Sequence, residues 1–114
     1  MISIEIIRDK DGNIRGLKSK GHAEYAESGS DIVCAAVSML LINSLNAIEK
    51  FSSTQMVLNE KTQEEGIIDV SFTGIPDEKA SVILDTMLLG LNDTAGQYGK
   101  KYLKLIDTIS TGRR

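Results

Sequence analysis

The chain begins with a regular alternation of apolar and polar residues. Residues 2–6 place an isoleucine at every second position, with a serine and a glutamate between them. A period of two is typical of a strand that buries one face. The pair Asp11-Gly12 that follows favours a tight hairpin turn, so residues 14–21 are predicted to form the returning strand.

Two later segments have helical patterns. A long apolar helix is predicted from about Asp31 to Lys50, with Asp31 as its N-cap. A second helix is predicted after a capping Asp77, with apolar residues at helical spacing as far as Ala95. The glycine-containing stretch 96–99 is expected to end that helix.

Three further strands complete the predicted fold. Residues 55–58 and 67–72 flank a charged hairpin, and residues 101–109 form a last strand. The element order is then ββαββαβ within one domain, residues 1–114. This order predicts an α+β two-layer sandwich, a mainly antiparallel sheet with two helices on one face.

Both predicted helices have apolar residues on more than one side. In the first, apolar residues cover every side of the first three turns, so that end must be packed all round. We therefore expect the helices of two subunits to cover each other in a symmetric homodimer. The alternative is that loops of the same chain cover them, because isolated apolar surface residues are common.

Composition and charge argue against several classes of function for this protein. The net charge is -3, lysines and arginines are dispersed, and two Phe with no Trp leave little for base stacking, so direct nucleic-acid binding is not expected. The longest apolar run, residues 32–42, is about half of the ~20 residues that a membrane span needs. Residues 1–12 lack the features of a secretory signal, and a single cysteine suits a reducing compartment, so a cytoplasmic location is expected.

The candidate chemistry lies in the single histidine, His22, and the single cysteine, Cys34. If a helix begins at Asp31, Cys34 lies in its first turn, where unpaired N–H groups and the helix dipole favour negative charge on sulfur. The same N–H groups could hold the oxyanion of a tetrahedral intermediate. His22 ends the second predicted strand, a suitable place for a base, and any Cys-His dyad must be this pair.

Each of these residues also has a plainer interpretation. Cys34 could be a small buried apolar residue of the helix, and His22 could simply end a strand with its hydrogen bonds satisfied. Asp31 could orient a protonated His22, although capping is the favoured role. Ser38, one turn after Cys34, could donate a hydrogen bond near the site or bond its own backbone.

The connection between the two candidate residues is polar and contains a glycine. We expect it to be a mobile loop that swings over the site. Its two glutamates could attract a basic substrate, or the loop could merely be solvated. The loop residues are Ala23, Glu24, Tyr25, Ala26, Glu27, Ser28, Gly29 and Ser30.

The sequence predicts neither a metal site nor a cofactor. One histidine and one cysteine cannot form a closed tetrahedral zinc site without two carboxylates, and the CxxC and HxxxH spacings are absent. The glycines do not have the spacing of nucleotide-binding loops.

The stretch G-H-A at residues 21–23, followed by a short loop and G-S-D-I-V-C-A-A-V-S at residues 29–38, resembles the bacterial ribosomal-processing cysteine proteases called Prp. The resemblance extends over essentially the whole chain. It implies a cysteine endopeptidase that removes an N-terminal extension from ribosomal protein L-twenty-seven of the large subunit. It also implies that His22 and Cys34 are catalytic, that Asp31 and Ser38 support them, and that the protein is a homodimer with a mobile loop.

Two other functions stay open. A non-catalytic ribosome-assembly protein could bind the same segment and keep Cys34 as core packing, and a purely structural dimer is a third possibility. Thiol reactivity separates these classes, because a catalytic sulfur is alkylated readily and a structural one resists until unfolding.

Overall fold

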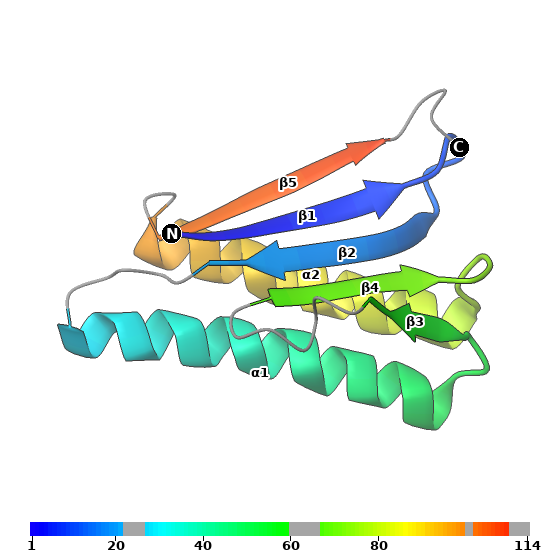
Figure 1. Ribbon diagram of the computed structural model, residues 1–114, viewed down its shortest axis with the longest axis horizontal. Coiled ribbons are helices and arrows are strands. Elements are labelled where there is room, and N and C mark those ends of the chain that lie inside the picture. Colours follow the sequence, from blue (N-terminus) through cyan, green and yellow to red (C-terminus); the bar gives the residue numbers. More distant parts are fainter. Residues whose placement is uncertain (22–26, 60–66, 100–101, 110–114) are drawn as a thin grey trace.

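The computed structural model describes residues 1–21, 27–59, 67–99 and 102–109, without the side chains of residues 27–31, 108 and 109. Its strands form one sheet, and its two helices lie together on one face of that sheet (Figure 1). The predicted α+β two-layer fold and the order ββαββαβ are therefore confirmed.

The sheet has the strand order β3-β4-β2-β1-β5. Its neighbouring strands are antiparallel, except that β5 runs parallel to β1 and pairs with it along its whole length. β4 and β5 run in the same direction with β2 and β1 between them, and α2 forms the crossover that connects them. The strands are β1 (Ile2–Arg8), β2 (Ile14–Lys20), β3 (Met56–Leu58), β4 (Ile67–Phe72) and β5 (Leu103–Ile109).

The turn between β1 and β2 forms where the sequence predicted it. Gly12 has a φ of 87°, a backbone conformation that glycine adopts without steric cost. The Asp9 carboxylate accepts hydrogen bonds from the backbone N–H groups of Asp11 and Asn13, at 2.9 and 3.0 Å. The side chain of Asp9 therefore stabilises the turn by accepting hydrogen bonds from its backbone.

The two helices run antiparallel, side by side on the same face of the sheet (Figure 1). They are α1 (Glu27–Phe51) and α2 (Glu78–Tyr98). They approach closely at Gly90, where an added Cβ would lie 2.8 Å from Cδ2 of Leu40. The absence of a side chain at Gly90 thus sets the spacing of the helix pair.

The start of α1 differs from the prediction. The helix begins at Glu27, so Asp31 is its fifth residue and not its N-cap. Residues 28–30, predicted as loop because serine and glycine favour loops, are helical. The low helix propensity of glycine costs only ~1 kcal/mol, which a helix of this length outweighs. The cap of α2 is as predicted, since the Asp77 side chain accepts a hydrogen bond from the Ala80 backbone N–H.

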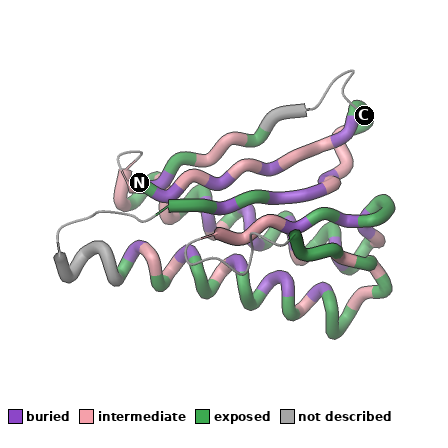
Figure 2. Tube along the Cα trace, viewed as in Figure 1, coloured by how far each residue is buried: buried purple, intermediate pink, exposed green. Residues whose placement is uncertain are grey.

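The core lies between the sheet and the helix pair, where the buried positions of both layers face each other (Figure 2). The sheet contributes alternate residues, as the period of two predicted. Both helices contribute a stripe at helical spacing. The largest fully buried side chains are Ile4, Ile6, Leu17, Leu41, Ile48, Leu84, Met87, Leu91, Leu103, Val33 and Val70.

One side of α1 packs on the core and much of the rest is uncovered. The segment Ile32–Phe51 is long and apolar enough to cross a membrane, a measure that the core helix of a soluble protein also meets. Its residues Val33, Leu41 and Ile48 are fully buried against the rest of the chain, as in a core helix. Yet only 28% of an 18-residue window of this segment is buried within the chain, and its exposed apolar side chains include Ile32, Met39, Ile42 and Phe51.

Candidate active site

Cys34 lies on the side of α1 that borders the core. It is half-buried and packs against the buried cluster. Because a helix repeats about every 3.6 residues, residues 34, 38, 45 and 49 lie along one side of α1. Leu40, on a different side, contacts α2 at Gly90. Cys34 therefore belongs to the side of α1 that faces away from α2.

The depth of Cys34 in α1 changes the predicted chemistry. It is the eighth residue of the helix, beyond the first turn to which the effect of the helix dipole is largely confined. In a helix, backbone N–H groups after the first four are bonded to the carbonyl four residues earlier. The prediction that unpaired N–H groups at a helix start surround Cys34 is therefore wrong, because the helix starts at Glu27.

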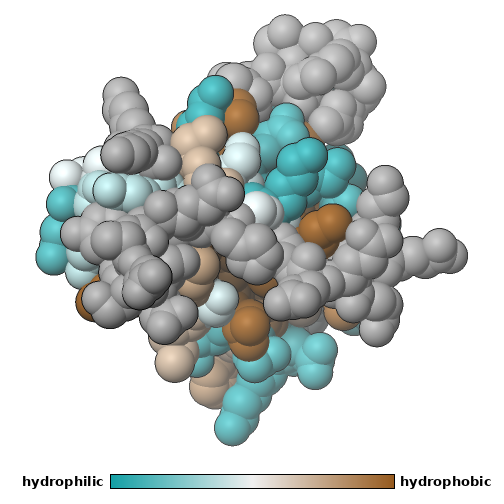
Figure 3. Space-filling model, turned by 60° about the vertical axis from the view of Figure 1, so that its left-hand side comes forward, coloured by the Kyte–Doolittle hydropathy of each residue, from teal (hydrophilic) through white to brown (hydrophobic). Residues whose placement is uncertain are grey.

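The strand before His22 ends in a fixed position. Gly21, which follows β2, has a φ of 97°, and a Cβ added there would collide with the carbonyl oxygen of Met1. β2 ends at the same end of the molecule as α1 begins (Figure 1). Figure 3 turns the end of the molecule where β2 ends and α1 begins toward the viewer. Hydrophobic and hydrophilic residues lie next to each other on this surface. Only glycine fits at residue 21 without moving the edge of the sheet.

The remaining predicted site residues are placed only in part. His22 and residues 23–26 lie outside the described residues, so the pairing of His22 with Cys34 stays a prediction. Asp31 belongs to α1, but its side chain is also outside the described part. Ser38 is exposed, one turn after Cys34. Of the predicted loop, Glu27, Ser28, Gly29 and Ser30 are instead part of α1.

A hollow that the sequence did not predict lies along the part of α1 that follows Cys34, and Cys34 itself does not line it. Its first part, about 320 Å³, is lined by Ala35, Ser38, Met39, Ile42, Asn43 and Asn46. Its second part, about 480 Å³, shares Ile42 and Asn46 with the first and lies between α1 and the strands β3 and β4. We call the two parts together the α1 groove.

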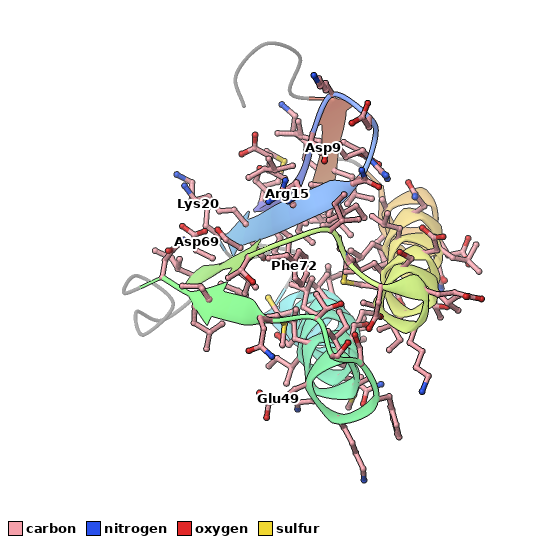
Figure 4. All side chains as sticks on the ribbon, turned by 90° about the vertical axis from the view of Figure 1, so that its right-hand side faces the viewer. Asp9, Arg15, Lys20, Glu49, Asp69 and Phe72 are labelled. Carbon is pink, nitrogen blue, oxygen red and sulfur yellow. The ribbon has the colours of Figure 1, made fainter. Side chains whose placement is uncertain are left out.

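The second part of the α1 groove is lined by both apolar and polar residues, and one of its described lining residues is charged. Glu49 is the charged side chain that lines it, on the side of α1 away from α2 and beneath β3 (Figure 4). The apolar lining residues are Ile42, Leu45, Met56, Leu58 and Ile68. The consecutive apolar residues of a short strand, MVL at 56–58, were the available sequence signal. Within the described part of the chain, His, Cys, Asp and Glu form no group of three suited to a metal ion.

Comparison with known proteins identifies the class. The family model described as Cysteine protease Prp matches residues 1–104. The chain belongs to this family, and it is a cysteine protease. It is 31% identical over 100 residues to the Ribosomal processing cysteine protease Prp of Staphylococcus aureus, an alignment that covers 88% of this chain and 93% of the relative.

Two further proteins extend the comparison. The protein of the same name from Bacillus subtilis is 28% identical over 102 residues, covering 86% of this chain and 90% of the relative. A crystal structure of the S. aureus protease Prp with a covalently linked product peptide is similar with a TM-score of 0.84 at 30% identity. That comparison covers 95% of this chain and 100% of the S. aureus chain.

Proposed function

We propose that this cysteine protease removes the N-terminal extension of ribosomal protein L-twenty-seven during maturation of the large ribosomal subunit. Membership in the Prp family, whose S. aureus and B. subtilis members are called ribosomal processing proteases, is the main observation in favour. The S. aureus protease, moreover, has been crystallised with a substrate peptide. Cys34 is half-buried on α1, the helix along which the α1 groove lies, although it does not line that groove.

Cys34 is the proposed nucleophile and His22 the proposed base. His22 takes the thiol proton, and the sulfur attacks the carbonyl carbon of the scissile peptide bond. The C–N bond then breaks as His22 gives the proton to the leaving amine. Water hydrolyses the thioester, which releases the carboxyl product and restores the thiol. Because Cys34 is well inside α1, the imidazole of His22 is the proposed source of activation.

The proposed assembly is a homodimer in the cytoplasm. Large apolar side chains are exposed on both helices, with Met39 66% and Leu89 64% exposed. Met39 is on α1, where it also lines the α1 groove, and Leu89 is on α2. A second copy placed over this helix pair would cover apolar surface that one chain leaves in water. No direct contact with nucleic acid or a membrane is part of this proposal.

The experiment uses the purified chain and the unprocessed ribosomal protein from the same bacterium. Cys34→Ala is expected to abolish removal of the extension, and Ser44→Ala, a change of a buried polar residue on the same helix, should retain it. Mass spectrometry of the product gives the new N-terminus, and circular dichroism confirms that both variants fold. Cleavage by Cys34→Ala at the normal rate would show that Cys34 is not the nucleophile, and binding without cleavage by the natural protein would favour the non-catalytic alternative.

A further inference from the structure

We infer that Gly99 and Tyr102, at the junction of α2 and β5, are positioning residues for the catalytic His22. They act through the main chain of Met1 and Gly21. The inference rests on the proposed role of His22 as the base that activates Cys34. It adds to that role a link between the end of α2 and the reaction.

Several elements begin or end at the same end of the molecule. β2 ends there and α1 begins there, and the starts of β1 and β5 lie beside the end of α2 (Figure 1). His22 follows directly after Gly21, and Cys34 lies in the first third of α1. The contacts that fix Gly21 therefore also fix the point from which His22 reaches toward Cys34.

Main-chain hydrogen bonds connect the end of α2 to the start of β1. The carbonyl oxygen of Gly99 accepts the N–H groups of Tyr102 and Leu103, at 3.1 and 3.4 Å. The carbonyl oxygen of Tyr102 in turn accepts the N–H of Ile2 at 2.9 Å. The position of Ile2 is therefore coupled to the conformation of Gly99.

The start of β1 extends this connection to β2. Met1 directly precedes Ile2, and its carbonyl group packs against Gly21 so closely that an added Cβ would collide with the carbonyl oxygen. In such close packing, Gly21 cannot move toward Met1 without displacing it. A displacement of Tyr102 is therefore transmitted through Ile2 and Met1 to the residue before His22.

The conformation of Gly99 determines where the chain goes as it leaves α2. Gly99 has a φ of 93° and a ψ of 155°, and its N–H donates to the Ala95 carbonyl at 2.8 Å. This backbone conformation is essentially confined to glycine. A Cβ added at Gly99 would meet no atom within 4 Å, so a substitution there acts through the backbone conformation alone.

The position of His22 matters because no helix start activates Cys34. Cys34 is the eighth residue of α1, beyond the turn where the helix dipole acts. Proton transfer from the thiol requires the base within about 2.6–3.2 Å. A misplacement of about 1 Å can lower a rate about a hundredfold. Because His22 acts in the chemical step, its displacement should lower kcat and change KM little.

Two other glycines provide matched controls. Gly12 has a similar φ of 87° and open space for a Cβ, but it lies in the turn between β1 and β2, at the other end of the molecule (Figure 1). Gly96 also has open space and lies within α2, three residues before Gly99. Gly12→Ala therefore repeats the conformational conflict far from His22, and Gly96→Ala repeats the added methyl group close to Gly99.

The test compares these variants of the full-length protein in cleavage of a peptide taken from the ribosomal-protein extension. Gly99→Ala should lower kcat about tenfold with KM within about twofold, and should slow alkylation of Cys34 by iodoacetamide at pH 7 to a similar extent. Gly99→Asn should lower both less, because asparagine adopts positive φ more readily than alanine. Gly12→Ala and Gly96→Ala should leave kcat and the alkylation rate unchanged.

The single histidine of the chain allows a second measurement that does not depend on activity. NMR spectra of the natural protein contain one set of imidazole signals, which belongs to His22. These signals should shift in Gly99→Ala and stay in place in Gly12→Ala. Thermal melts give a temperature at which all variants are folded, and Gly99→Asn replaces Gly99→Ala in both measurements if the alanine variant does not fold.

Failure of this inference and failure of the proposed function give different results. Equal losses of kcat in Gly99→Ala and Gly12→Ala, or unchanged kcat and histidine signals in Gly99→Ala, would overturn the inference. Alkylation of His22→Ala at the natural rate would refute the dyad, and the inference with it. If the natural protein does not cleave the ribosomal-protein extension, the proposed substrate is wrong, and the alkylation rates and histidine signals still decide the inference.

Discussion

Ser52 joins the end of α1 to the start of α2 by donating a hydrogen bond from its hydroxyl to the Asp77 carboxylate at 2.8 Å. The same carboxylate accepts the Ala80 N–H at 2.8 Å, and both the backbone N–H and the hydroxyl of Ser53 at 3.0 and 3.1 Å. Asp77 is therefore a helix cap and a link between the two helices. Four donors converge on this one side chain.

Asp77 makes stability depend on pH. Its pKa is held well below the ordinary value, first by the Ala80 N–H and then by the Ser52 hydroxyl. A group whose pKa is lowered by folding stabilises the folded state fully above about pH 5 and loses this contribution as the pH falls below about 4. Asp77→Ala should lower the Tm at pH 7 by about 4–8 °C. Asp77→Asn, which can still cap the helix, should lower the Tm by a smaller amount.

Thermal melts between pH 3 and pH 7, followed by circular dichroism, provide the measurement. The difference in Tm between the natural protein and Asp77→Asn should shrink toward acidic pH, because the Asp77 carboxylate of the unfolded chain binds a proton there while the folded one, with its lowered pKa, does not. A difference that is constant across this range would show that the charge of Asp77 does not contribute.

Replacing Gly21 and Gly12 in turn by alanine compares the effect of an added side chain at two positions with similar backbone conformations. Both have positive φ, 97° and 87°, but a Cβ at Gly12 has open space around it and one at Gly21 meets the Met1 carbonyl. Gly12→Ala should cost only the left-handed backbone penalty, ~1–2 kcal/mol. Gly21→Ala should cost more and should also lower the cleavage rate, because it displaces the chain directly before His22. Urea unfolding and peptide cleavage measure the two effects, and equal values for both variants would contradict the prediction.

His22 should be the main activator of Cys34, since a helix that begins at Glu27 leaves no helix start beside the sulfur. The rate of alkylation by iodoacetamide at pH 7 should fall at least about tenfold in His22→Ala. Loss of the thiol is followed by mass spectrometry on the folded protein. An unchanged rate in this variant would remove His22 from the proposed dyad.

The dimer should depend on exposed residues of α2. Val82 and Leu89 are 60% and 64% exposed and seven residues apart, so they lie on one side of the helix. Neither lines the α1 groove. The double change Val82→Lys and Leu89→Lys should convert the protein to monomers in sedimentation experiments, and Val57→Lys on β3 should not. A dimer that survives the double change would place the interface elsewhere.

Periodicity predicted the elements, but not how distant elements meet. The alternating isoleucines of β1 and the helical spacing of α2 correctly indicated a two-layer fold. The parallel pairing of β5 with β1 was not predicted, because pairing over such a distance leaves no local pattern. The start of α1 was misplaced because Ser28, Gly29 and Ser30 favour loops locally, whereas the structure continues the helix through them.

The residue types of the chain were enough to predict the two candidate catalytic residues, but not the groove beside them. A single cysteine and a single histidine left one possible dyad, which required no knowledge of the fold. The α1 groove could not be predicted in this way, because its walls come from α1, β3 and β4. Ile42 and Leu58 look like ordinary apolar residues until those elements are placed against each other.

The pairing of β1 with β5 has a consequence for biosynthesis. β1 is an inner strand, and its second neighbour, β5, is synthesised after every other strand of the sheet. Leu103, at the start of that late strand, is fully buried. Until β5 is made, one edge of β1 has unpaired backbone groups and part of the core is uncovered. The domain therefore cannot finish folding before residues 103–109 have left the ribosome.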